Sequence, residues 1–279
     1  MNREPRARSL QGTAIAFALV WIGAAAPSHA DEVQDAFRRA QEAFASVQRA
    51  SEEHPSAAEE ARARYREVAD AFARLYTERG VCSAKLFVNA GNAYFFAGDL
   101  GRAALFYRRA LVLDPREPKA RAGLVAVRRR LPWRPPPSPG TDLLRALFFW
   151  HEGLSFAARR AAFAGTWLLA FVLLGLARRR RGFLWAAIPC ALIASALLGS
   201  LAVSASAPPP ERQGVILTSV QGRTGDGRSY SPSHSAPLPA GSEVEVLEER
   251  GGWLRVLLRD RSPAWVPASC VERLAPPGS

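Results

Sequence analysis

Apolar residues follow different patterns along this chain of 279 residues, and the first pattern is helical. In DEVQDAFRRAQEAFASVQRA they recur at three- and four-residue steps, which predicts an amphipathic helix with one apolar face: Val33, Phe37, Ala40, Phe44 and Val47. A second helix is expected over residues 57–76, before Arg79 and Gly80. Its apolar face carries Tyr65, Val68, Phe72 and Leu75.

The next segment, AKLFVNAGNAYFFAGDLGRAALFYRRALVLDPRE, spans residues 84–117 and resembles one tetratricopeptide repeat of about 34 residues. Its small and large residues fall in register with the two helices of that repeat: Phe87, Gly91, Tyr94, Ala103, Tyr107 and Ala110, with Pro115 at the end. One repeat cannot bury both of its faces. The preceding helical pair and a helix over about 118–131 are therefore expected to complete a stack over residues 31–134.

Such a stack suggests a groove for an extended peptide or a partner helix. The first helix of the repeat would present Lys85, Asn89, Asn92 and Phe95 there, and the next helix would add Lys119. Amides and lysines suit backbone groups or an acidic chain end. The alternative, that Asn89 and Asn92 only solvate this face, stays open.

Two long apolar runs without charge follow, at residues 161–177 and 183–207. Each is close to the ~20 residues that cross a bilayer as a helix, so a transmembrane hairpin is expected; a buried hairpin in a soluble protein is the alternative. Small residues every four positions permit close packing on the first span or on another subunit: Ala187, Ala191, Ser195 and Gly199. Arg178, Arg179, Arg180 and Arg181 fill the connection 178–182, which predicts a cytoplasmic loop.

The chain begins like a secretory signal peptide over residues 1–30. Arg3, Arg6 and Arg8 precede an apolar run, and small residues lead to cleavage after Ala30. An uncleaved anchor is the alternative, and both place residue 31 outside the cytoplasm. Residues 135–160 are expected to form a proline-rich linker and a segment lying on the outer membrane surface.

Beyond residue 208 the pattern changes to period two, in GVILTSV, SEVEVLEE, WLRVLLRD and PAWVPASCVERL. Five or six short strands in so short a segment predict a small all-β barrel. RTGDGRSY, LPAGSEVEVLEERGGWLRV and AWVPASCVERL resemble the bacterial SH3-like domain. That resemblance implies binding of peptides or cell-wall material, with Tyr230, Trp253 and Trp265 as surface candidates. Packing of both tryptophans in the core is the alternative.

The net charge of +12 suggests nucleic acid or anionic lipid at first. However, residues 31–118 hold 13 basic and 14 acidic side chains, and residues 213–279 hold seven of each, so neither soluble part is basic. The basic cluster from Lys119 to Arg134 is interpreted as charge at a helix end that favours the helix dipole and solubility; a patch for lipid or an acidic partner is the alternative. Catalytic motifs such as HExxH, GxSxG, Walker loops and GxGxxG do not occur, and the four histidines are scattered. We expect no catalytic residue, cofactor, metal or nucleic acid; a Cys82–Cys270 disulfide is an open alternative.

The order of leader, helical stack, two spans and SH3-like domain resembles the BatE family of bacterial aerotolerance proteins. NAGNAYFFAGDLGRAALFYRRALVLDP and FFWHEGLSFAARRAAFAGTW carry the resemblance best. It implies a multidomain protein of the inner membrane, whose partners are von Willebrand factor A domain proteins and a MoxR-type AAA ATPase. We therefore expect a non-enzymatic scaffold with both soluble domains in the periplasm, linked to aerotolerance or envelope stress. An envelope sensor or peptidoglycan-binding module acting through the SH3-like domain is the alternative.

Overall fold

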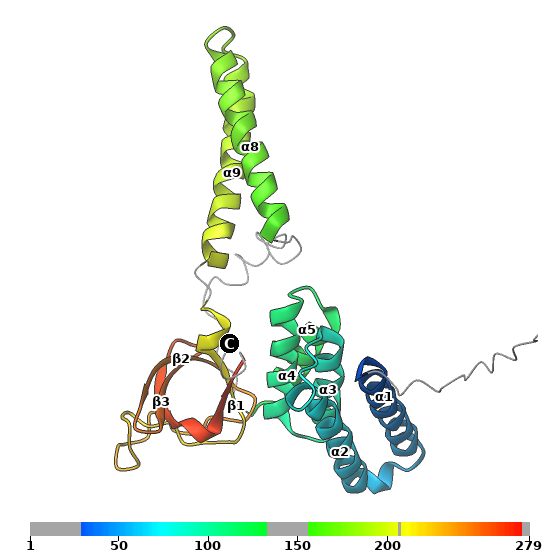
Figure 1. Ribbon diagram of the computed structural model, residues 1–279. Helices are drawn as coiled ribbons and strands as arrows, with labels where there is room; N and C mark the ends of the chain where they lie inside the picture. The colour runs from blue at the N-terminus through cyan, green and yellow to red at the C-terminus, as the bar shows by residue number, and fades with distance from the viewer. Residues whose placement is uncertain (1–28, 133–155, 206–207, 275–279) are drawn as a thin grey trace, which may run out of the picture.

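A computed structural model describes residues 29–132, 156–205 and 208–274. These residues form a helical stack, a helical hairpin and a small β-sheet, and Figure 1 shows that the hairpin projects away from the other two. The expected signal peptide, apart from its last two residues, lies outside the described residues. So does most of the proline-rich and interfacial segment 135–160.

Five helices build the stack: α1 (His29–Glu53), α2 (Ala58–Thr77), α3 (Ala84–Phe96), α4 (Leu100–Leu113) and α5 (Pro118–Arg130). The apolar face expected for the second helix is confirmed, because its four residues are buried. Side-chain caps fix where α3 and α4 begin: Ser83 accepts from the N–H of Leu86 (3.1 Å) and Asp99 from that of Arg102 (3.0 Å). Helix α3 is followed by Gly98, whose φ of 82° is a conformation that favours glycine and ends the helix.

Tyr107 joins three helices of the stack. Its ring lies between two glycines: a Cβ on Gly91 of α3 would come within 2.7 Å of it, and one on Gly123 of α5 within 2.3 Å. Larger residues at either position would push the helices apart. The small residues expected at the helix contact therefore have a specific partner, the fully buried phenol ring of α4.

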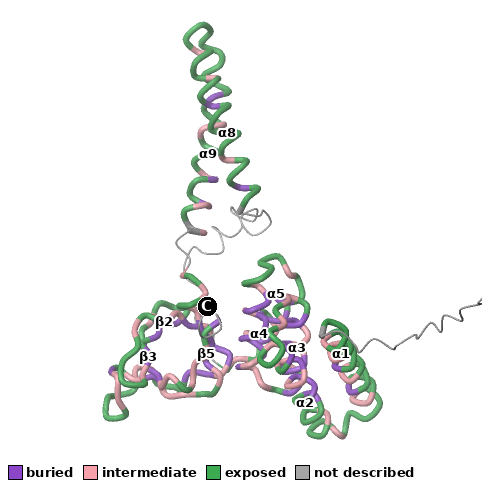
Figure 2. The backbone as a smooth tube through the Cα atoms, in the orientation of Figure 1, coloured by how far each residue is buried: buried purple, intermediate pink, exposed green. Residues whose placement is uncertain are grey.

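The hairpin consists of α8 (Phe156–Ala177) and α9 (Phe183–Ala205), which pack against each other. Both are long and apolar enough to cross a membrane. Figure 2 shows that most of their length is exposed, so they do not form the buried hairpin of a soluble protein. Helix α8 begins five residues before the expected boundary at 161 and includes Arg159 and Arg160.

Arg159 links the two helices at the end of the hairpin opposite the connecting loop. Its buried guanidinium donates hydrogen bonds to Ser200 Oγ (2.8 Å) and Ser204 Oγ (3.0 Å) in the last turns of α9. A cation in this place also compensates the negative end of the helix dipole.

The small-residue stripe on α9, expected to pack on the first span or on another subunit, contacts α8 only in part. Ala187 is buried against the rest of the pair, but Ser195 and Gly199 are exposed. Each four-residue step passes a full turn of the helix by about 40°, so the predicted stripe drifts away from α8. Ala194 and Ser200 lie on the packed face instead.

The C-terminal unit is an antiparallel sheet of five described strands: β1 (Gln213–Ile216), β2 (Glu243–Arg250), β3 (Trp253–Leu258), β4 (Pro263–Pro267) and β5 (Val271–Arg273). Their order is β4-β3-β2-β1-β5. The sheet curls, as Figure 1 shows, but no pairing of β4 with β5 closes it within the described residues. The expected closed barrel is therefore an open sheet, because the three-residue β5 is reached from β4 through a short 3-10 helix and pairs only with β1.

The sheet domain docks on α4 and α5 of the helical stack, although the hairpin separates the two in the sequence. Val215 and Leu274 of the sheet domain belong to the same buried cluster as the apolar residues of the stack. At Gly101 of α4 the backbones nearly touch, because a Cβ there would lie 2.4 Å from the carbonyl oxygen of Leu217. The two soluble parts therefore form one unit.

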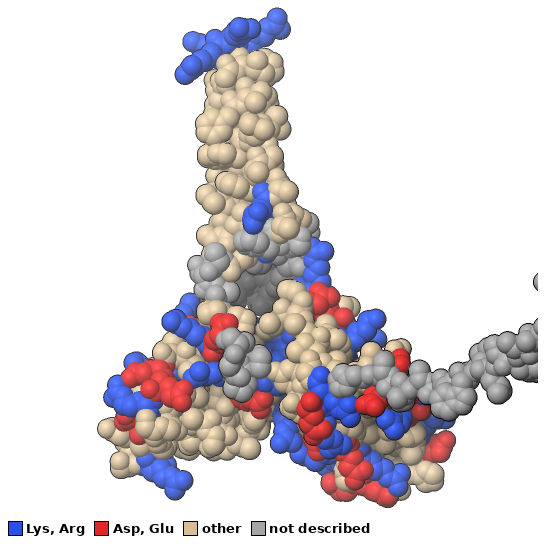
Figure 3. All heavy atoms as spheres, in the orientation of Figure 1, with Lys and Arg blue, Asp and Glu red and all other residues tan. Residues whose placement is uncertain are grey.

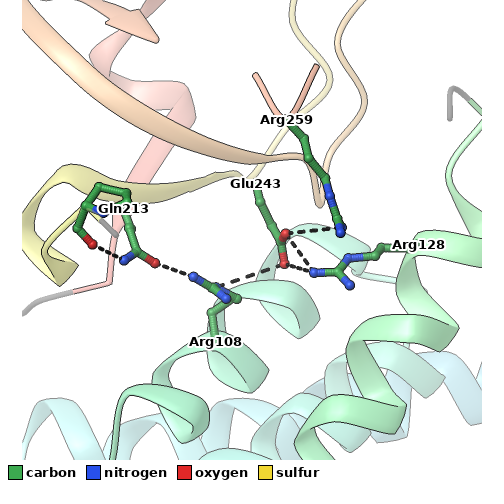
Figure 4. A network of polar contacts seen from close by, with 6 residues as sticks. Arg108, Arg128, Gln213, Glu243 and Arg259 are labelled. Atoms are coloured by element: carbon green, nitrogen blue, oxygen red, sulfur yellow. Dashed lines mark hydrogen bonds and ion pairs between the residues drawn. The ribbon is translucent and has the colours of Figure 1, made fainter. Parts of the chain in front are cut away.

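Arginines of the stack bind carboxylates and amides of the sheet domain along this contact (Figure 4). Arg128 donates both to Glu243 Oε1 (2.9 Å) and to Glu243 Oε2 (2.8 Å), while Arg108 donates to the amide oxygen of Gln213. Arg259 lies 3.9 Å from the same Glu243 carboxylate. Arg128 thus lies in the last turn of α5, as a helix-end charge does, but it also pairs with the sheet domain and is not only a solvated charge.

Candidate functional site

The face of the stack formed by α1, α3 and α5 carries the residues predicted to bind a peptide, and we call it the concave face. Helix α3 contacts both α1 and α5, while α2 packs on α1 and α3, and α4 packs on α3 and α5. Lys85, Asn89 and Asn92 follow one another at helical spacing along α3, and Lys119 lies in the first turn of α5. Helical spacing therefore places Lys85, Asn89 and Asn92 on one face of α3, and Lys119 is exposed at the start of the neighbouring helix α5.

A small pocket of about 160 Å³ opens on the concave face between α1 and α3. Its walls are Phe44 and Phe72, and its polar groups are Gln41, Asn89 and Asn92. A cavity of about 150 Å³ holds a molecule the size of benzene. The pocket thus has room for one apolar side chain, with amide groups around it to bind the neighbouring backbone.

Asn92 has a structural partner as well as a place in the pocket. The hydroxyl of Tyr107 donates a hydrogen bond to its side-chain oxygen (2.7 Å). This bond fixes the orientation of the amide and leaves its NH2 group as a donor. The view that Asn89 and Asn92 only solvate the surface therefore does not fit Asn92, which links the pocket to the packed interior.

An aromatic ladder continues from the pocket across the concave face. The ring of Phe96 stacks on Tyr65 (centroids 5.2 Å apart) and lies 6.0 Å from Phe44 and 5.8 Å from Phe95. Phe96 is 45% exposed. Phe95 is covered by the guanidinium of Arg130, 4.0 Å from its ring centroid.

Phe96 is therefore the more accessible aromatic residue, although Phe95 was the predicted one. The signal that identifies Phe96 is its spacing, four residues after Asn92 on the line from Lys85 through Asn89. Arg130 adds positive charge beside Phe95, and Lys85 and Lys119 are exposed in the first turns of α3 and α5. The surface combines an apolar pocket, an open aromatic ring and positive charge, which suits an acidic segment with one apolar anchor.

The three residues predicted for the sheet domain all lie at its surface. Trp253 and Trp265 are half-buried and alternate with the core residues Leu254 and Val266, so both point away from the core face of β3 and β4. Packing of these tryptophans in the core is thus excluded. Tyr230 is 48% exposed, and Arg223 joins its loop to β4 through the backbone of Trp265 (2.9 Å).

The four arginines between α8 and α9 lie at the far tip of the hairpin (Figure 3). Arg178, Arg179 and Arg180 are exposed, as is Arg181. The rest of the described hairpin between this tip and Arg160 carries no charged side chain. A basic connection between two apolar helices is the arrangement that the positive-inside rule describes for a two-span hairpin.

A chain of polar groups in the sheet domain resembles a catalytic triad only superficially. Nδ1 of His234 contacts Ser233 Oγ (2.8 Å), and its Nε2 contacts Ser262 Oγ (3.0 Å). Ser262 Oγ in turn donates to Asp260 (2.6 Å). In a triad the carboxylate orients the histidine and the serine gives its proton to that histidine; here the carboxylate binds the serine.

Within the described ranges, no three His, Cys, Asp or Glu side chains come together as a metal site requires. Cys82, Cys190 and Cys270 are free, so the alternative of a Cys82–Cys270 disulfide is not realised. Comparisons with protein-family models, with curated proteins and with solved structures gave no match.

Proposed function

We propose that this protein is a non-enzymatic scaffold of the bacterial inner membrane whose helical stack holds a segment of a partner protein. The observation that carries the proposal is the concave face. There a pocket of about 160 Å³ adjoins the exposed ring of Phe96 and the amides of Asn89 and Asn92. An apolar side chain of the partner enters the pocket, while its backbone binds the amides.

The proposed fold classes are a tetratricopeptide-type stack and an SH3-like domain. In support of the first, the hairpin α3–α4 has the repeat's length, and Gly91 packs on Tyr107 as the close helix contact requires. In support of the second, five short antiparallel strands form one curled sheet. The LPAG and GGW elements lie at the turns that lead into β2 and β3.

In the proposed topology, Arg178–Arg181 lie in the cytoplasm and both soluble domains in the periplasm. The direct contact between these domains supports their placement on the same side, because domains on opposite sides of a membrane cannot touch. The signal peptide and the basic tip favour the same orientation. A cytoplasm-only reporter fused after residue 134 or after residue 279 should be inactive, and activity at either position would overturn the orientation.

The resemblance to the BatE family suggests the partners. We propose membrane-anchored von Willebrand factor A domain proteins as the ligands of the concave face, in a complex with a MoxR-type ATPase that serves aerotolerance or envelope-stress tolerance. The cationic residues Lys85, Lys119 and Arg130 favour an acidic segment of such a partner.

Co-purification from membranes tests this function. We expect the wild-type chain to retain a von Willebrand A domain protein, and the variant Asn89→Asp/Phe96→Ser to lose it, because the variant removes the open ring and adds negative charge. The matched control Glu67→Asp/Arg74→Ser changes exposed residues of α2. Equal recovery with all three chains, or recovery with none, would contradict the proposal.

A cell-wall-binding module remains a second candidate, because Trp253 and Trp265 lie on the outward face of the sheet. The guanidinium of Arg250 stands 5.7 Å from the Trp265 ring. Retention of the full chain on purified peptidoglycan, lost in Trp265→Ala, would favour this function. The full chain is needed because the isolated segment 208–279 would expose Val215 and Leu274, which the stack covers.

A further inference from the structure

A second, larger cleft lies at the junction of the helical stack and the sheet domain. Its volume is about 730 Å³, within the range of about 300–1,000 Å³ that is typical of ligand sites. Arg66, Asp99 and Arg102 line it from the stack, and Thr218 and Ser219 line it from the sheet domain. The cleft therefore exists only when the two domains are docked.

The guanidinium groups on the stack side of the cleft make few close contacts with carboxylates. Arg66 makes one long hydrogen bond to Asp99 (3.3 Å), whereas Arg102 approaches Asp99 and Asp70 only to 3.8 and 3.9 Å. Both arginine side chains are nearly half exposed, while that of Asp99 is 15% exposed. Each guanidinium has five N–H donors, so most of these donors are available to a ligand.

The wall from the sheet domain adds neutral donors and apolar surface. Thr218, Ser219 and Ser269, which carry hydroxyl groups, line the cleft. Within the described ranges, the backbone N–H groups of Thr218 and Ser219 make no hydrogen bond. Leu217 and Pro239 provide apolar contacts beside them.

Two glycines permit the close approach of the stack and the sheet domain beside the cleft. Gly101 admits the backbone of Leu217, and Gly241 adopts φ 94° with its N–H donating to Ile216 (2.7 Å). A Cβ on Gly241 would lie 3.0 Å from the carbonyl oxygen of Leu100. The cleft is consequently part of the fixed contact between the domains.

We propose that this junction cleft binds a carboxylate-rich peptide segment of a partner protein. Among the charged residues that line the cleft, two half-exposed guanidinium groups outnumber one largely covered carboxylate, since Asp70 lies beside Arg102 but outside the lining. Arginine binds carboxylates with paired hydrogen bonds. The hydroxyl and N–H groups opposite bind the backbone, and the leucine and proline residues accept the apolar side chains between the acidic ones. The site lies apart from the concave face and goes beyond the function proposed above.

The test measures binding of a fluorescent peptide of alternating glutamate and leucine to the full chain in detergent micelles. The control peptide has the same sequence with glutamine in place of every glutamate. We expect saturable binding of the acidic probe alone. Binding should weaken about tenfold or more in Arg66→Gln/Arg102→Gln. It should weaken similarly in Ser219→Trp, which fills the cleft from the other domain without a change of charge.

Four results would overturn this proposal. One is no saturable binding of the acidic probe. Another is an equal loss in the control Arg62→Gln/Arg64→Gln, whose arginines lie on the same helix and bind only Glu59 and Glu60 of their own helix. The third is full binding by Ser219→Trp. Loss of binding in Lys85→Gln/Lys119→Gln instead would assign the probe to the concave face and likewise contradict the cleft site.

Discussion

Arg109 of α4 and Glu272 of β5 form an ion pair at 2.8 Å although 163 positions separate them in the sequence. Arg109 is buried, and it also donates to the carbonyl oxygens of Arg273 and Leu274 (both 3.3 Å). Its guanidinium stands 5.1 Å from the ring centroid of Tyr76. One side chain thus connects the helical stack to the last strand of the sheet domain.

Replacing Arg109 should loosen this connection. Arg109→Ala leaves the carbonyl oxygens of the sheet domain unpaired, and we expect it to lower the free energy of unfolding by about 3 kcal/mol. Arg62→Ala, which breaks an exposed pair within α2, should change it by about 0.5 kcal/mol or less. Denaturant unfolding in micelles gives both values. Equal effects of the two substitutions would mean that Arg109 does not hold the domains together.

Gly101→Ala tests the close approach of the backbones at the same contact. Alanine favours the helix by about 1 kcal/mol over glycine, but its methyl group would collide with the carbonyl of Leu217. We expect a net loss of about 1–3 kcal/mol and faster proteolysis between the domains. Gly165→Ala in α8, where nothing lies within 4 Å, is the control and should not destabilise the protein. A stabilised Gly101→Ala protein would contradict the docked arrangement.

The buried tyrosines of the stack predict a loss of stability at alkaline pH. Burial raises the pKa of the Tyr107 phenol, and burial together with the hydrogen bond to Asp70 raises the pKa of Tyr94. The folded chain holds these protons more tightly than the unfolded chain, whose tyrosines titrate near pH 10. Stability should therefore be unaffected by these groups below about pH 10 and fall as the pH rises above it.

Unfolding measured across this range, with the wild type and with Tyr94→Phe/Tyr107→Phe, checks the tyrosine effect. The double variant is less stable at neutral pH, because it loses the hydrogen bonds to Asp70 and Asn92. Its stability should fall less steeply above about pH 10. Identical slopes for the two proteins would show that other groups cause the alkaline loss.

Arg159 should stabilise the hairpin in the membrane. Arg159→Ala removes the hydrogen bonds to Ser200 and Ser204, and we expect it to weaken the association of α8 with α9 by about 1 kcal/mol. Arg160→Ala, one position along the same helix and exposed, is the comparison. The measurement is helix separation in bilayers followed by energy transfer between labels on the two helices. A larger effect at Arg160 would refute the role given to Arg159.

Local patterns were sufficient to predict the helices of the stack, the two long apolar helices and the period-two strands. Each of these depends on residues within a few positions of one another, such as Tyr65, Val68, Phe72 and Leu75 on α2. The same holds for Lys85, Asn89 and Asn92, which helical spacing alone places on one face. The same spacing includes Phe96, but the choice of Phe96 over Phe95 as the accessible ring depends on Arg130, which covers Phe95 from another helix.

The docking of the two soluble domains had no local signal. Arg108, Arg109 and Arg128 have the helical spacing of ordinary solvated arginines, and their partners follow more than 100 positions later. Gly101 looks like any small residue of a helix until Leu217 is placed beside it. Contacts of this kind depend on the shape of both domains, which a pattern within one segment does not contain.

Photo-crosslinking in living cells tests the central claim, that the concave face holds a segment of a partner protein, most directly. A photoreactive amino acid replaces Phe96 on that face or, as the control, the exposed Arg74 of α2. We predict a crosslink from position 96 to a membrane-anchored von Willebrand A domain protein, and none from position 74. Crosslinks of equal yield from both positions, or none from position 96, would contradict the account.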